Sequence, residues 1–193
     1  MRRMMSALAR LWLRLSGWRV EGEPPRVSCV YLAYPHSSNW DGWMLLLHAW
    51  ALHLDLRWMI KEQWLKPPLG GVLKMLGAVG VDRSASTGMV GQMVAEFERR
   101  DFFMLCVPPE GTRSRRDFWK SGFYHIAREA KVPICLGVLD YGQKRAGFGP
   151  LLELTGDMAV DMSNIRAHYE ERGPKARFPA KTGPIRLRAE DEA

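Results

Sequence analysis

A histidine and an aspartate separated by four residues offer the groups that acid–base chemistry needs. They are the first and last residues of the segment His36-Ser37-Ser38-Asn39-Trp40-Asp41. A neutral imidazole can take a proton from an alcohol near pH 7, and a carboxylate on its other nitrogen fixes the tautomer and stabilises the imidazolium. In one continuous helix the two side chains would lie about 140° apart. Contact therefore requires a turn, with a helix beginning near Asn39 or Trp40; alone, the spacing is weak evidence.

A second polar segment, Pro109-Glu110-Gly111-Thr112-Arg113-Ser114, lies downstream. Its glycine permits close approach of the backbone to a ligand, its hydroxyls can donate hydrogen bonds, and Arg113 can hold a phosphate bidentately. An equal alternative is a polar loop in which Arg113 only pairs with Glu110. The role of Asp82 and Arg83 has the same two interpretations. They could bind a ligand, but an Asp–Arg pair at a strand end is often only a surface ion pair.

Other catalytic signatures do not occur in the sequence. No segment matches a nucleophile elbow, a Walker-type phosphate loop or a zinc-ligand spacing. Cys29, Cys106 and Cys135 stand in apolar runs, which indicates buried free thiols in a reducing compartment. We therefore expect no metal and no covalent intermediate.

Both polar segments follow apolar runs with the character of β-strands, 27–33 and 102–107. Further strands are predicted at 56–60, within 77–83 and at 132–139, and helices at about 41–53, 72–76, 84–99, 119–130 and 157–171. This alternation predicts a single α/β domain with a largely parallel central sheet flanked by helices. Because α/β proteins place their chemistry where strands end, we expect the two polar segments to face each other across one active site.

The N-terminal segment is predicted to be a basic amphipathic helix. Large apolar side chains recur at helical spacing, and Ser6, Arg10 and Arg14 fall on the opposite side. Tryptophans at the apolar edge and many arginines are typical of a helix that lies in a membrane surface, and the net charge of +7 implies an anionic partner. The alternative is a helix whose apolar side packs on the domain. No apolar run is long enough for a spanning helix.

These patterns divide the chain into a membrane-surface helix (1–20), a catalytic domain (21–175) and a Pro/Lys/Arg tail (176–193) that we expect to be mobile. Nucleic acid is a weaker candidate for the anionic partner, because the basic residues are scattered and no base-reading motif occurs.

Taken in order, the motifs resemble those of the glycerolipid (lysophospholipid) acyltransferase superfamily. His36 to Asp41 matches its first motif, a His followed after four residues by an Asp. Gly80-Val81-Asp82-Arg83 resembles the second motif, Pro109 to Ser114 matches the third, and Val132-Pro133-Ile134 resembles the start of the fourth. The resemblance covers roughly residues 27–140.

The resemblance implies transfer of a fatty acyl chain from acyl-CoA or an acyl-carrier protein to a hydroxyl of a lysophospholipid, such as 1-acylglycerol-3-phosphate. His36 would be the general base and Asp41 would orient it, with no metal and no cofactor beyond the acyl-thioester co-substrate. Gly111 and neighbouring amides would stabilise the oxyanion. The acceptor and its phosphate would be bound by Arg83, Glu110, Gly111, Thr112 and Arg113.

The implied location is the cytoplasmic face of the cell membrane, where a peripheral enzyme meets its lysolipid acceptor; no nucleic acid is expected as a partner. Two alternatives remain open from sequence. One is a catalytically inactive lipid-binding or scaffold protein, which requires that His36 and Asp41 do not meet. The other is acyl transfer to a lipid acceptor that is not a glycerophosphate.

Overall fold

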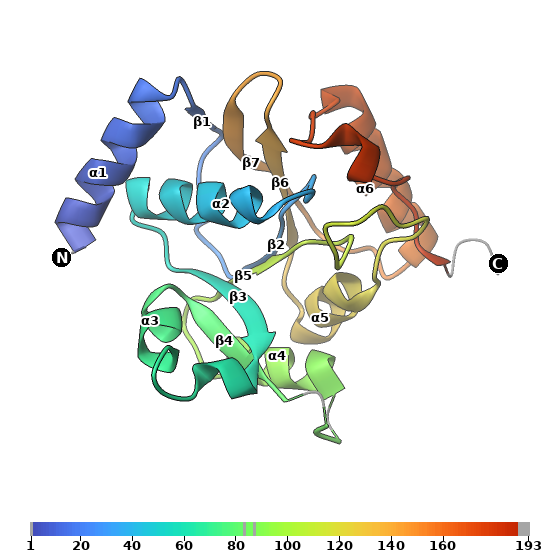
Figure 1. The fold of residues 1–193 in the computed structure, drawn as a ribbon. Helices are drawn as coiled ribbons and strands as arrows, with labels where there is room; N and C mark the ends of the chain where they lie inside the picture. Colours follow the sequence, from blue (N-terminus) through green and yellow to red (C-terminus); the bar gives the residue numbers. More distant parts are fainter. Residues whose placement is uncertain (1, 83, 87, 189–193) are drawn as a thin grey trace.

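A seven-stranded sheet runs through the centre of the computed structural model, which describes residues 2–82, 84–86 and 88–188 (Figure 1). The strands are β1 (Arg19–Glu21), β2 (Cys29–Leu32), β3 (Leu56–Lys61), β4 (Ala78–Val81), β5 (Met104–Val107), β6 (Ile134–Asp140) and β7 (Arg145–Leu152). Their order is β1-β7-β6-β2-β5-β3-β4. Strands β6, β2, β5, β3 and β4 are parallel, and β7 runs antiparallel to β6. The predicted α/β domain with a largely parallel sheet is confirmed.

Helices cover both faces of the sheet. They are α1 (Arg2–Leu15), α2 (Asn39–Ala51), α3 (Gly70–Met75), α4 (Gly88–Glu98), α5 (Gly122–Ala130) and α6 (Met158–Arg172), with short 3-10 turns η1 (Glu62–Leu65) and η2 (Pro179–Lys181). Helix α4 begins later than the predicted residue 84. Helix α6 begins after Asp157, whose side chain accepts hydrogen bonds from the N–H groups of Ala159 and Val160 and so caps the helix.

The topology brings the two polar segments together. Strands β2 and β5 are neighbours and parallel, so the segments that follow them leave the same edge of the sheet. From β2 the chain crosses through α2 toward β3, whereas from β5 it crosses through α5 to β6, on the other side of β2. Right-handed crossovers in opposite directions place α2 and α5 on opposite faces. The ends of β2 and β5 therefore flank a topological switch point, where α/β proteins bind ligands.

Alternate side chains of β2 enter two separate cores. Val30 and Leu32 pack with the side chains of α4, α5 and α6 on one face of the sheet. Cys29 and Tyr31 point to the opposite face, toward α2, and share it with the other two cysteines. All three cysteines are free thiols and are buried. The face toward α2 is the one that carries the site.

Helix α1 packs on α2 through its small side chains. Ser6 and Ala9 are buried, and the Ser6 hydroxyl donates to the carbonyl of Ala51 at the end of α2 (3.4 Å). We expected Ser6 to lie on the polar side with Arg10 and Arg14, and this was wrong: small side chains let the two helices approach closely. Leu13 is buried in the same contact, whereas the other large apolar residues of α1 are turned outward, the most exposed being Met4, Leu8, Leu11 and Leu15.

Residues 176–188, predicted from sequence to be part of a mobile tail, lie along the domain in the structure. Leu187 is buried and forms a parallel bridge with Trp119, whose N–H donates to the carbonyl of Arg186 (2.8 Å). The N–H of Phe178 donates to the hydroxyl of Ser37, next to His36 (3.2 Å). The segment thus reaches the edge of the sheet where the polar segments meet.

Candidate active site

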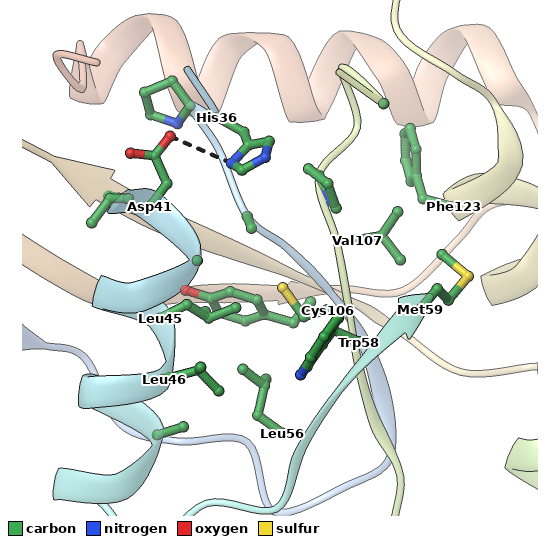
Figure 2. A pocket seen from close by; sticks show the side chains of 18 of the residues that line it. His36, Asp41, Leu45, Leu46, Leu56, Trp58, Met59, Cys106, Val107 and Phe123 are labelled. Carbon is green, nitrogen blue, oxygen red and sulfur yellow. Dashed lines mark ion pairs between the residues drawn. The ribbon is translucent and has the colours of Figure 1, made fainter. Parts of the chain in front are cut away.

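The turn required between His36 and Asp41 is present. Helix α2 begins at Asn39, and Ser38 and Asp41 form a reciprocal capping box at its first turn. Nδ1 of His36 lies 3.4 Å from Oδ2 of Asp41 (Figure 2). The imidazole is one-fifth exposed and the carboxylate is buried. The structure therefore brings together the imidazole and the carboxylate that the sequence analysis paired.

Asp41 is surrounded by hydrogen-bond donors. Its Oδ2 accepts the N–H groups of Ser37 (2.6 Å) and Ser38 (2.7 Å). Its Oδ1 accepts the hydroxyls of Ser38 and Tyr141, both at 2.8 Å. Burial by itself would raise the pKa of Asp41, but the hydrogen bonds from His36, Tyr141 and Ser38 outweigh it and lower the pKa to about 2. The carboxylate is ionised at every pH near neutrality.

Glu110 supports the His36 segment from behind. Its Oε2 accepts the backbone N–H of His36 at 2.8 Å, and its side chain is buried. Burial raises the pKa of Glu110 to about 8, the N–H of His36 opposes this rise, and the negative charge of Asp41 adds to it. Glu110 is therefore mostly protonated at pH 7. We predicted a role in substrate binding, but the structure places Glu110 behind His36, outside the cavity lining.

Of the remaining residues of the second polar segment, Gly111 and Arg113 line a cavity beside the dyad, whereas Thr112 does not. Gly111 has φ +64°, and a Cβ there would meet Cγ of Lys120 at 2.8 Å, so glycine is needed. Its N–H donates to the carbonyl of Pro108 (3.0 Å) and is not available to an oxyanion while that turn is closed. Arg113 donates to Oδ1 of Asn39 at the start of α2. Thr112 accepts the N–H of Ser114 (3.3 Å), and Arg83 lies outside the described residues.

A cavity of about 1130 Å³ opens beside the dyad. His36, Asn39, Arg113 and Lys120 line its polar end. The rest of its wall is largely apolar and comes mainly from α2, β2, β3, β5, β6, β7 and the start of α5, as Figure 2 shows for Leu45, Leu46, Leu56, Trp58 and Phe123. Asp41, Leu45 and Ala49 recur every four residues along α2, so the lined stretch is about 12 Å long at 1.5 Å per residue. The cavity therefore joins the His36 imidazole to a long apolar space.

The model of a family described as "Acyltransferase" matches residues 20–136, more than half of the chain. The chain belongs to the acyltransferase family. This match confirms the resemblance that the four motifs carried. It also contains both polar segments and the strands that place them.

The acyltransferase fold is also found in a solved structure. The chain is similar to the crystal structure of PlsC, the 1-acyl-sn-glycerophosphate (LPA) acyltransferase from Thermotoga maritima, with a TM-score of 0.60 and 15% sequence identity. The match covers 92% of this chain and 81% of the PlsC chain. At this identity the similarity concerns the fold. No curated protein matches this acyltransferase.

Sequence reasoning missed two parts of the acyltransferase site. Tyr141 contacts Asp41 across 100 residues of chain, and a single tyrosine after a strand gives no signal for such a contact. The cavity wall on α2 was also missed. A signal was present there, because Asp41, Leu45 and Ala49 share one helix face with Gly42 and Leu46. That face bears the Asp41 carboxylate at the N-terminal end of α2 and apolar side chains along the following turns.

Proposed function

We propose that this acyltransferase moves a fatty acyl chain from a thioester to a hydroxyl of a lysophospholipid, with His36 as general base. One observation carries the proposal: the His36–Asp41 dyad stands at the polar end of a long, largely apolar cavity. A thioester bound with its acyl chain in that cavity would present its carbonyl near His36. The similarity to PlsC, which is named for 1-acyl-sn-glycerophosphate, supports a glycerophosphate acceptor.

The chemistry follows from the orientation of the imidazole. With Nδ1 toward Asp41, the lone pair of Nε2 is available to the acceptor hydroxyl. His36 takes the hydroxyl proton as the oxygen attacks the thioester carbonyl, forming a C–O bond and a tetrahedral oxyanion. The intermediate expels the thiolate, which takes the proton back from the imidazolium and leaves as a thiol. Protons and electrons balance without an acyl-enzyme.

The two ends of the cavity suit the two ends of such a substrate. The apolar wall would shield an acyl chain from water, which is favourable by about 0.8 kcal/mol per buried CH₂ group. Arg113 and Lys120 at the polar end would meet the phosphates of the donor or the acceptor. Arg113 is held by Asn39, the first residue of α2, so the cation is fixed close to the dyad.

The deciding experiment follows transfer of a labelled acyl group from acyl-CoA to a panel of lysolipids. Loss of a general base costs about 100- to 10,000-fold in rate, so His36→Ala should nearly abolish turnover and leave the thermal unfolding temperature unchanged. His125→Ala on α5 is the matched control, because it removes an imidazole outside the cavity lining. Turnover of His36→Ala close to that of the parent enzyme would refute the role of His36.

Membrane docking is the second part of the proposal, and the outer face of α1 supports it. Large apolar side chains point away from the domain, and Arg3, Arg10 and Arg14 are exposed on the same helix. A helix of this kind lies in the headgroup region of an anionic leaflet. Within the described ranges, no helix has both the length and the apolar character that a membrane span needs. The proposed location is the cytoplasmic membrane surface.

A second exposed apolar set extends the proposed membrane surface. It lies on η1 and α3 and consists of Trp64, Leu69, Val72 and Met75, each at least half exposed, with Lys61, Lys66 and Lys74 beside them in the chain. Helices α1 and α3 both lie on the left of the domain in Figure 1, and we propose that the membrane surface contacts both. Trp64 also lines the cavity. An acyl chain could therefore pass from the bilayer to the site.

Sedimentation with anionic liposomes tests the docking. Replacing Arg10 and Arg14 by Glu should weaken binding, because each juxtamembrane cation contributes about 1 kcal/mol to attraction to an anionic leaflet. Arg128→Glu with Lys131→Glu is the matched control, since it changes the net charge equally at the exposed end of α5. Equal sedimentation of the α1 variant and the parent enzyme would contradict docking through α1.

The donor is the third part of the proposal, and a basic surface beside the cavity favours an acyl-carrier protein, which is acidic. Segments 113–120 and 175–188 lie together through the Trp119–Arg186 hydrogen bond, and Asp117 is their one acid. Their cations are Arg113, Arg115, Arg116, Lys120, Lys175, Arg177, Lys181, Arg186 and Arg188. Arg115→Glu with Arg116→Glu should raise KM for acyl-carrier protein more than for acyl-CoA; an equal rise would indicate CoA phosphates instead.

A further inference from the structure

Tyr141 stands where three parts of the fold meet beside the dyad. It follows the last residue of β6, and its hydroxyl donates to Asp41 Oδ1 at 2.8 Å. Its backbone N–H donates to the carbonyl of Lys175, in the C-terminal segment, at 2.8 Å. Trp18, just beyond α1, stands edge-on to its ring with centroids 5.1 Å apart at 89°. The guanidinium of Arg177 lies 5.9 Å from the ring centroid.

The other donors to Asp41 belong to its own segment. Oδ2 accepts two backbone N–H groups and faces His36, and Oδ1 accepts the hydroxyl of Ser38. Among the described residues, Tyr141 is the one hydrogen-bond donor to this carboxylate from outside residues 36–41. It therefore fixes Asp41 relative to the sheet, whereas the donors of residues 36–41 can move together with the carboxylate.

The phenol of Tyr141 is a permanent donor. Burial raises its pKa well above the usual range, and the hydrogen bond to Asp41 and the negative charge of that carboxylate raise it further, although Ser38 and Arg177 partly oppose them. Asp41, with a pKa of about 2, only accepts. The direction of this hydrogen bond is consequently the same at every pH at which the enzyme would work.

We propose that Tyr141 is a positioning residue, whose hydroxyl sets the direction and the residual charge of the Asp41 carboxylate and thereby the strength of His36 as a base. The proposal rests on the proposed role of His36 in acyl transfer. Tyr141 adds a contact that holds the dyad to the residue directly after the C-terminal end of β6. Through Trp18, it also links the dyad to the helix proposed to lie in the membrane surface.

Tyr141→Phe removes one oxygen atom and should have two effects. Without the hydroxyl, Asp41 loses a hydrogen bond to a charged group and its fixed point on the sheet, so kcat should fall about tenfold. Tyr141 lies outside the cavity lining, so KM for the acyl thioester should not change. The carboxylate also keeps more of its negative charge and favours the imidazolium. The acid limb of kcat/KM should therefore move to higher pH by about half a unit.

Other titratable or charged groups near Tyr141 and the dyad come from several elements. Glu110 approaches from the segment after β5, Arg177 from the C-terminal segment, and His48 of α2 contacts the far side of Trp18 at 6.0 Å. Tyr141→Phe leaves all three in place. A shift of the acid limb between the parent enzyme and the variant therefore reports the loss of the Tyr141 hydroxyl.

The control is Tyr124→Phe, which removes the same oxygen from a buried tyrosine–aspartate pair between α5 and α6, where Tyr124 donates to Asp161 at 2.9 Å. It should lower the unfolding temperature without moving the acid limb. His36→Ala is assayed beside both variants; if it stays active, the proposed function itself fails. If His36→Ala is inactive but Tyr141→Phe keeps the parent acid limb, Tyr141 has no positioning role, whether or not kcat falls.

Discussion

Glu110→Gln tests the electrostatics of the site in detail. Burial, aided by the charge of Asp41 and opposed by the N–H of His36, raises the pKa of Glu110 from 4.5 to about 8. At pH 7 the native state must therefore hold a proton that the unfolded chain has released. Because pH 7 lies 2.5 units above 4.5 and each unit is worth 1.36 kcal/mol, this uptake costs about 3 kcal/mol. Glutamine is neutral, has the same shape and needs no proton.

The sign of the effect follows from proton linkage. A carboxyl group whose pKa is raised on folding binds more protons in the native state than in the unfolded state. With such a group, the folded protein is most stable below about pH 4.5 and becomes less stable as the pH rises toward 8. The Glu110→Gln variant does not lose stability over this pH range, because glutamine does not titrate. The two proteins should be equally stable near pH 4.5, and Glu110→Gln should be the more stable by about 3 kcal/mol at pH 7.

Thermal unfolding followed by circular dichroism from pH 4.5 to 8 measures this difference. For a chain of 193 residues, 1 kcal/mol shifts the unfolding temperature by about 2–4 °C, so the variant should gain roughly 6–12 °C at pH 7. Glu98→Gln, an exposed glutamate at the end of α4, is the control and should show no pH-dependent difference. A Glu110→Gln variant that is less stable at every pH would refute the reasoning, because Glu110 would then be ionised in the native state.

Two further predictions concern the dyad and the cavity. Asp41→Asn keeps the shape of the side chain but removes the charge that stabilises the imidazolium and fixes the tautomer of His36. We expect kcat to fall by about 10⁴-fold in a thioester-release assay. A change in kcat of less than twofold would contradict the role of Asp41. Leu46→Trp fills part of the apolar cavity and should shift the preference toward shorter acyl chains. The rate with the shortest chain should stay within about twofold of the parent rate. An unchanged preference across thioesters of increasing chain length would place the acyl chain elsewhere.

The sequence predicted the fold and the dyad because both depend on local patterns. Apolar runs marked β2 and β5, and the turn between His36 and Asp41 followed from a strand ending near Pro35. In a parallel sheet the segments after the two strands leave the same edge, and they meet because β2 and β5 are neighbours.

Contacts that depend on the packed structure were not predictable in the same way. Periodicity identified α1 as amphipathic but did not show that Ser6 and Ala9 would face the domain. The direction of Glu110 depends on the backbone of His36, which comes from another strand end. Tyr141 reaches Asp41 only because β6 lies beside β2, and that order is a property of the whole sheet.

The two faces of the sheet have different consequences for change by mutation. The face that packs on α4, α5 and α6 is largely filled with buried side chains, whereas most of the cavity lies on the face toward α2, with Val107 and Phe123 of the other face reaching its lining. Substitutions in a filled core leave voids or clashes, but side chains that border an open space can change size without either. Variants of Leu45 or Leu46, which line the cavity and are only half-buried, should therefore change the size of the proposed acyl-chain site at little expense in folding, whereas Leu56 belongs to the buried core. Selectivity and thermostability can evolve, or be engineered, on opposite sides of one sheet.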